Sequence, residues 1–117
     1  MNYKLTCYCS ACNSPKGTRN VAYNPNDKDK KKGMPTQATA GFTVAVSKSK
    51  YKEDQGKRIE LYILDKNENV ISSHQPFIMD FHGKGSEIID FYIGEREKCE
   101  CSKHPWSGKK CKFIYLD

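Results

Sequence analysis

The sequence predicts an all-β protein, a compact sandwich or small barrel of about seven short strands, with disulfide bonds and at most one short helix. Apolar and polar residues alternate in short stretches, and this alternation is the period of a β-strand. Clusters of turn-forming residues separate the stretches. Six cysteines stand near the two ends of a chain of 117 residues, which is the usual size of one domain.

The strands are predicted from their alternating apolar positions. In chain order these positions are Tyr3, Leu5, Cys7 and Cys9; Phe42, Val44 and Val46; Ile59, Leu61 and Ile63; Val70 and Ile71; Phe77, Met79 and Phe81; Ile89, Phe91 and Ile93; and Phe113 and Tyr115. The third stretch also has Tyr62 and Leu64 on its other face, so we expect it to be a central strand. The turn cluster Asp65–Asn69 makes the third and fourth stretches a hairpin.

The segments between the strands show little helical pattern. Ser14–Pro15 can cap and begin a short helix that runs toward Ala22. Residues 24–37 combine prolines, a glycine and a run of lysines, which predicts a long mobile loop. Residues 47–57 are expected to form a second polar loop. Because no change in composition marks a boundary, residues 1–117 are expected to form a single domain.

The chain is basic, with 20 lysines and arginines, 14 acidic residues and a net charge of +6. Lysine supplies most of the positive charge, and its compact ammonium suits attraction to acidic surfaces better than specific reading of nucleic acid. We therefore expect an acidic macromolecule as the partner, with nucleic acid less favoured. No apolar run approaches the roughly 20 residues of a membrane span. The expected contact residues are Lys30, Lys31, Lys32, Lys50 and Trp106.

The cysteines form two clusters, Cys7-x-Cys9-x-x-Cys12 and Cys99-x-Cys101 with Cys111. An even number of cysteines in a small domain favours disulfides. Pairing within Cys7-x-Cys9 is disfavoured, because alternate strand residues share a face but lie too far apart for an S–S bond. We therefore expect all six cysteines to form disulfides, largely between the clusters, in a connectivity that the sequence leaves open. Such links would make the first and last strands neighbours.

Zinc is the alternative explanation of the cysteines. Cys9-x-x-Cys12 and Cys101-x-x-His104 have the spacing of zinc-binding pairs. This ligand set would leave the other three cysteines as thiols, so disulfides are favoured and no cofactor is expected. Trp106 lies in the loop between Cys101 and Cys111. It is either an exposed contact residue or, as we favour, a cover for the cysteine cluster.

One stretch resembles the small fungal guanyl-specific ribonucleases. It runs from Arg58-Ile59-Glu60-Leu61-Tyr62-Ile63-Leu64 to Val70-Ile71-Ser72-Ser73-His74. The resemblance implies a hydrolase that uses His74, Glu60 and Arg58 in acid–base catalysis. The Tyr-x-His and Glu-Phe/Trp-Pro motifs of these enzymes are missing here. The favoured interpretation is therefore that His74 is a structural histidine, that the protein has no catalytic residues, and that it is not an enzyme.

The whole chain resembles in type the small secreted effectors and toxins of fungi, which are short, rich in lysine and tyrosine, β-rich and disulfide-linked. Some of these effectors resemble ribonucleases but lack their catalytic residues. The shared elements here are an early aromatic residue beside Cys7 or Cys9 and the late Cys111-Lys112-Phe113. The resemblance implies a secreted virulence protein that binds a host or competitor protein, or another acidic macromolecule, through its lysine-rich loops. The alternatives are the ribonuclease-like hydrolase and an intracellular zinc-stabilised module that binds nucleic acid.

Overall fold

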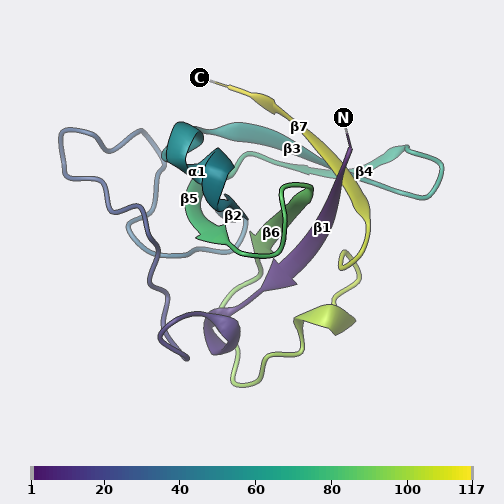
Figure 1. Ribbon diagram of the computed structural model, residues 1–117, viewed down its shortest axis with the longest axis horizontal. Coiled ribbons are helices and arrows are strands. Elements are labelled where there is room, and N and C mark those ends of the chain that lie inside the picture. The colour runs from purple at the N-terminus through teal and green to yellow at the C-terminus, as the bar shows by residue number, and fades with distance from the viewer. Residues whose placement is uncertain (1, 117) are drawn as a thin grey trace.

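The computed structural model describes residues 2–116 and confirms the mostly β fold (Figure 1). The elements are β1 (Tyr3–Tyr8), the 3₁₀ helix η1 (Ser10–Cys12), β2 (Thr43–Ser47), α1 (Lys48–Asp54), β3 (Ile59–Leu64), β4 (Val70–His74), β5 (Phe77–His82), β6 (Ile88–Tyr92), the 3₁₀ helix η2 (Cys101–Lys103) and β7 (Lys110–Tyr115). Every strand predicted from alternation is present among these residues. Most differ from their predicted positions by a residue or two at the ends, which is usual, whereas β4 runs three residues beyond Ile71 and β7 begins three residues before Phe113.

The strands form one mixed sheet in the order β4-β3-β7-β1-β6-β2-β5. The first and last strands, β1 and β7, are antiparallel neighbours, as predicted. An isolated bridge between Arg58 and Phe77 joins the beginning of β3 to the beginning of β5. Beside it, Ile59 N donates to Pro76 O at 3.0 Å and Ile78 N donates to Lys57 O at 2.9 Å. The sheet therefore curls until its two sides meet, which makes a small barrel rather than a sandwich.

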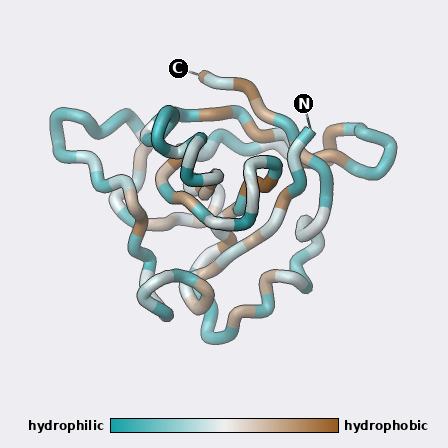
Figure 2. The backbone as a smooth tube through the Cα atoms, viewed as in Figure 1, coloured by the Kyte–Doolittle hydropathy of each residue, from teal (hydrophilic) through white to brown (hydrophobic). Residues whose placement is uncertain are grey.

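Alternate strand residues fill the inside of the barrel. The buried cluster consists of Leu5, Val44, Val46, Ile59, Leu61, Ile63, Ile78, Ile89, Phe91 and Cys111. Figure 2 shows the same division along the chain, with apolar residues in the strands and hydrophilic residues in the projecting loops. Burying one such aliphatic or aromatic side chain contributes about 1.5–3 kcal/mol, so this cluster is the main source of stability.

A second cluster lies on the outer face of the barrel. Tyr8, Ala45 and Tyr92 point outward from their strands, and Val21 and Met34 of the long connection between η1 and β2 cover them. Met34 is 1% exposed. The predicted loop at residues 24–37 is therefore irregular, as expected, but it is attached to the barrel by a buried side chain.

Two predictions of local structure are wrong. We expected residues 47–57 to form a loop, but they contain the helix α1. Ser47 caps this helix, and its side chain accepts a hydrogen bond from Lys50 N at 3.4 Å. The expected helix from Ser14 to Ala22 is absent from the described chain. Gly17 there has a φ of +85°, which is incompatible with a helix. No helix within residues 2–116 is long and apolar enough to cross a membrane.

Candidate functional site

The two cysteine clusters meet where β1 and β6 end. These strands are parallel, so the segments that follow them leave the sheet side by side. Ile93 N donates to Tyr8 O at 2.8 Å, and Ser10 N donates to Gly94 O at 3.1 Å. The buried Ser10 hydroxyl also accepts from Arg96 N at 3.0 Å and lies 3.3 Å from Arg96 O. These bonds hold the segment before Cys99 against η1.

Four sulfur atoms gather at this junction. The Sγ atoms of Cys9, Cys12, Cys99 and Cys101 all lie within 4.8 Å of one another. Cys12 and Cys99 form a disulfide with a Cα–Cα distance of 5.3 Å. Cys12 Sγ also lies 3.4 Å from Cys9 Sγ and 3.5 Å from Cys101 Sγ. The prediction that disulfide bonding links the two clusters is confirmed.

The disulfide network is smaller than expected. In the described chain Cys7, Cys9, Cys101 and Cys111 are free and buried thiols. Cys111 on β7 faces the inside of the barrel, where the buried cluster contains no second cysteine among residues 2–116. Burial raises the pKa of Cys111 to about 12. The pKa of Cys7 is raised to about 11, mainly by burial and to a smaller extent by the Asp90 carboxylate. Both thiols are therefore protonated and unreactive at neutral pH.

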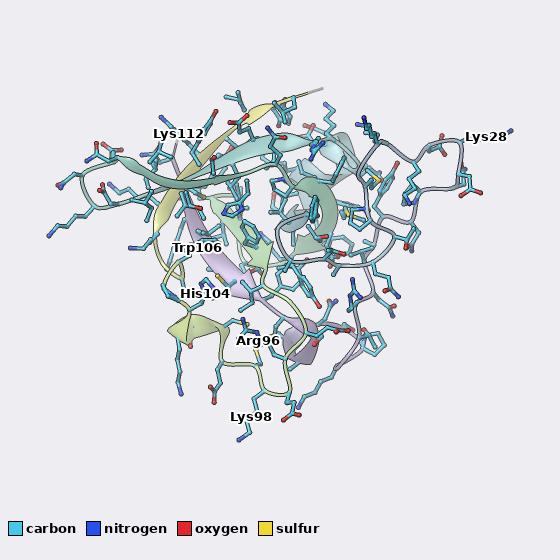
Figure 3. All side chains as sticks on the ribbon, turned by 180° about the vertical axis from the view of Figure 1, so that it is seen from behind. Lys28, Arg96, Lys98, His104, Trp106 and Lys112 are labelled. Atoms are coloured by element: carbon cyan, nitrogen blue, oxygen red, sulfur yellow. A yellow bond between two sulfur atoms is a disulfide. The ribbon has the colours of Figure 1, made fainter. Side chains whose placement is uncertain are left out.

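The alternative zinc set needs one correction, because Cys99 rather than His104 joins Cys9, Cys12 and Cys101 in the sulfur cluster. His104 instead packs its ring against Trp106, with centroids 5.2 Å apart, and its Nδ1 accepts a hydrogen bond from Trp106 N at 3.2 Å (Figure 3). The sequence could not reveal this exchange, because the approach of Cys99 depends on the pairing of β1 with β6.

Trp106 covers the cysteine cluster, which was the favoured of its two predicted roles. The half-buried indole packs against the buried Cys7, Cys9 and Cys101. Its ring centroid lies 5.0 Å from that of His74 and 5.7 Å from that of Phe91. These contacts bury part of the indole inside the protein, so Trp106 is not a fully exposed contact residue.

The residues of the ribonuclease-like alternative do not converge. His74 pairs with Leu61 across β3 and β4 and therefore shares its inward face. Its Nε2 lies 2.8 Å from Ser72 Oγ, and burial lowers its pKa. Glu60, next to Leu61, points to the opposite face of the sheet. Arg58 donates from Nε to Gln75 O at 2.9 Å and stacks on the Phe77 ring.

A cleft that the sequence did not suggest lies beside the sulfur cluster. Its volume is about 540 Å³, and Cys12, Cys99 and Cys101 form part of its wall. Asp80 of β5 and Asp90 of β6 both line this cleft. They lie on the same face of the sheet, because each pairs in register with Ala45 of β2, the strand between them. The signal available in the sequence was two aspartates in the middle of otherwise apolar strands.

The two aspartates of the cleft differ in their surroundings. Asp90 accepts from Thr6 Oγ1 at 2.9 Å and from Lys84 Nζ at 2.9 Å. Burial raises the pKa of Asp80, with a smaller contribution from the Asp90 carboxylate. Burial, followed by the Asp80 carboxylate, raises the pKa of Tyr8 on the same wall well above its usual value. The cleft is therefore polar and is large enough for a small ligand.

The predicted lysines fall into two groups. Lys30, Lys31 and Lys32 are exposed in the irregular segment of residues 24–37, which we call the lysine loop. It projects from the side of the barrel (Figures 1 and 3). Lys50 is half-buried on α1, and its ammonium lies 5.8 Å from the Tyr3 ring centroid and 5.5 Å from that of Phe113. Lys50 therefore anchors the helix by cation–π contacts and is a poor candidate for binding a partner.

Comparison with models of protein families, with curated proteins and with solved structures found no match to this chain.

Proposed function

We propose that this chain is a secreted, effector- or toxin-like, non-enzymatic binding protein. It engages an acidic surface of a host or competitor protein through the lysine loop. The observation that carries this proposal is the way in which the loop is built. It presents a cluster of exposed lysines on a base that is fixed to the barrel.

Hydrogen bonds fix the base of the loop at both ends. Ala38 N donates to Arg19 O at 2.8 Å, and Arg19 Nε donates to Ala38 O at 2.8 Å. Tyr23 N donates to Met79 O of β5 at 3.0 Å. The buried Met34 adds an apolar anchor at the end of the lysine run. A loop held in this way loses less conformational entropy on binding than a free tail of the same composition.

The chemistry of the loop favours an acidic protein over a specific nucleic-acid site. Lys28, Lys30, Lys31 and Lys32 are exposed point charges, with Asp27 and Asp29 among them. Lysine attracts carboxylates without the bidentate geometry that base reading uses. The Cys12–Cys99 bond supports secretion, because disulfides persist in oxidising compartments. The separation of His74 from Glu60 supports a binding role rather than catalysis.

A charge-reversal experiment tests the role of the lysine loop. The triple variant Lys30→Glu, Lys31→Glu, Lys32→Glu is compared with Lys66→Glu, Lys110→Glu, Lys112→Glu, which changes the net charge equally at other exposed positions. Lys112 lies on the other side of the molecule from Lys28 (Figure 3). We expect the loop variant to bind immobilised polyglutamate at least about tenfold more weakly at low ionic strength, and the control to change much less.

Equal losses in the two triple variants would show that net charge alone governs binding and would contradict the proposal. Cleavage of RNA by the wild-type chain that disappears in His74→Ala would replace the binding role with a hydrolase. Circular dichroism of each variant checks that the barrel is intact.

A further inference from the structure

The sulfur cluster is more crowded than a disulfide requires. An S–S bond brings two cysteines together, and here Cys12 and Cys99 make that bond. Cys9 and Cys101 nevertheless place their sulfurs within 3.4 Å and 3.5 Å of Cys12 Sγ. Among these four residues, Cys9 and Cys101 are buried, and Cys12 and Cys99 are exposed.

This arrangement is close to that of a tetrahedral zinc site. Zinc binds four thiolates at about 2.3 Å, which places the sulfurs about 3.8 Å apart in a regular tetrahedron. The sulfurs in the structure lie within 4.8 Å of one another, so small side-chain rotations bring them to that spacing. The ligands come as two short-range pairs, Cys9-x-x-Cys12 and Cys99-x-Cys101. The first pair has the usual spacing of structural zinc sites, and the second is one residue shorter.

The backbone holds the two pairs in place before any metal binds. Cys9 precedes η1, Cys12 is its last residue, and Cys101 begins η2. The hydroxyl of Ser10 bonds to both backbone groups of Arg96, which fixes the second pair against the first. Arg96, Lys98 and Lys103 line a cavity against Cys101 together with Glu95, Glu97 and Glu100, so the charges on this wall balance. The placement of the four sulfurs, and not the surrounding charge, therefore favours the site.

We propose that Cys9, Cys12, Cys99 and Cys101 bind one zinc ion when the Cys12–Cys99 bond is reduced. A reductant of the thiol class supplies two electrons and two protons to that bond and is itself converted to a disulfide. The four protein thiols then release one proton each as zinc binds. A sulfur in a disulfide is not a thiolate ligand, so the two states exclude each other. In either state the two ends of the chain remain joined.

Metal binding by the full chain tests the proposal directly. The reduced protein is mixed anaerobically with zinc sulfate, and bound metal is counted by native mass spectrometry. We expect one zinc per reduced chain and none per oxidised chain. Cobalt, substituted for zinc, should give the strong visible bands of a tetrahedral ion together with thiolate charge-transfer absorption. Failure of the reduced wild-type chain to bind zinc in a one-to-one ratio would overturn the proposal.

Two matched variants identify the fourth ligand. Cys99→Ser removes a proposed ligand, and His104→Ala removes the histidine of the alternative set. We expect Cys99→Ser to weaken zinc binding about 100-fold or more and His104→Ala to leave it within about threefold of the wild type. The reverse order of effects would overturn the four-cysteine site in favour of one containing His104.

Two further variants control for the loss of any cysteine. Cys7→Ser and Cys111→Ser each remove a buried thiol outside the sulfur cluster. Both should retain one zinc per chain with the same cobalt spectrum, even if they lower the thermal stability. A loss of zinc in these controls as large as that in Cys99→Ser would refute the assignment. The cobalt spectrum reports the ligand set directly, so a folding defect is distinguished from a missing ligand.

Discussion

At the scale of single residues, Ser10 links the parts of the site. It is 4% exposed, and its hydroxyl lies 3.0 Å from the backbone nitrogen of Arg96 and 3.3 Å from its carbonyl oxygen. The chain after β6 has left the sheet at this point, so a side chain supplies the hydrogen bonds that a neighbouring strand otherwise would. The position of Cys99, three residues later, therefore depends on a serine near the other end of the sequence.

The variant Ser10→Ala tests this role. It leaves the two backbone groups of Arg96 without their partner, and we expect the free energy of unfolding to fall by about 1–3 kcal/mol. Urea denaturation measures the change, with the exposed Ser102→Ala as the control. The reduced variant should also react faster with a thiol-labelling reagent at Cys101. A loss no greater than in the control would mean that Ser10 does not hold the segment.

At the scale of elements, the strands could be predicted and the helix could not. A strand alternates between two environments, so the apolar positions of β3 and β5 are visible in the sequence. The helix α1 has seven residues, of which Tyr51 alone is a large apolar side chain that packs on the barrel. Two turns are too short to show a helical period, and the lysines on its exposed side are equally typical of a loop.

The far end of α1 contains a buried carboxylate that couples stability to pH. Asp54 Oδ2 accepts from the Tyr115 hydroxyl at 2.6 Å, and Oδ1 lies 3.1 Å from Lys57 Nζ. Burial by itself would raise the pKa of Asp54, but the hydrogen bonds from Tyr115 and Lys57 outweigh it and hold the pKa below its usual range. A carboxyl whose pKa is lower in the folded state stabilises the fold above its unfolded pKa, and this stabilisation is lost as the pH falls through the folded value.

The variant Asp54→Asn should therefore lower the free energy of unfolding at pH 7 by about 1–2 kcal/mol, after allowance for the half-exposed Lys57. It should lose much less as the pH falls from 5 to about 2 than the wild type does. The control is Glu53→Gln, an exposed carboxyl on the same helix. Urea denaturation at a series of pH values measures both. Parallel pH profiles for Asp54→Asn and the wild type would show that Asp54 does not carry this dependence.

At the scale of the whole molecule, parallel pairing of β1 with β6 decides where the chemistry lies. The spacing within the cysteine clusters was enough to predict a link between the two ends. It could not show that Cys99 replaces His104, because that depends on the path of the chain after β6. The cleft was missed for a similar reason. Asp80 and Asp90 occupy strand positions that seem merely solvent-facing until both strands pair with Ala45.

The Cys12–Cys99 bond closes a loop with a sequence separation of 87 residues, so its removal tests how far the tie between the ends stabilises the barrel. In the absence of strain, closing such a loop lowers the entropy of the unfolded chain by an amount equivalent to about 4–5 kcal/mol, which is an upper estimate. The double variant Cys12→Ser, Cys99→Ser should be less stable than the oxidised wild type by up to that amount in urea denaturation.

With reductant and a metal chelator present, the disulfide is absent from both proteins, and the difference in their stability should nearly vanish. When zinc replaces the chelator, the wild type should regain stability and the double variant should not, because it lacks two of the four proposed ligands. Equal stability of the oxidised wild type and the double variant would mean that strand pairing alone holds the two ends together.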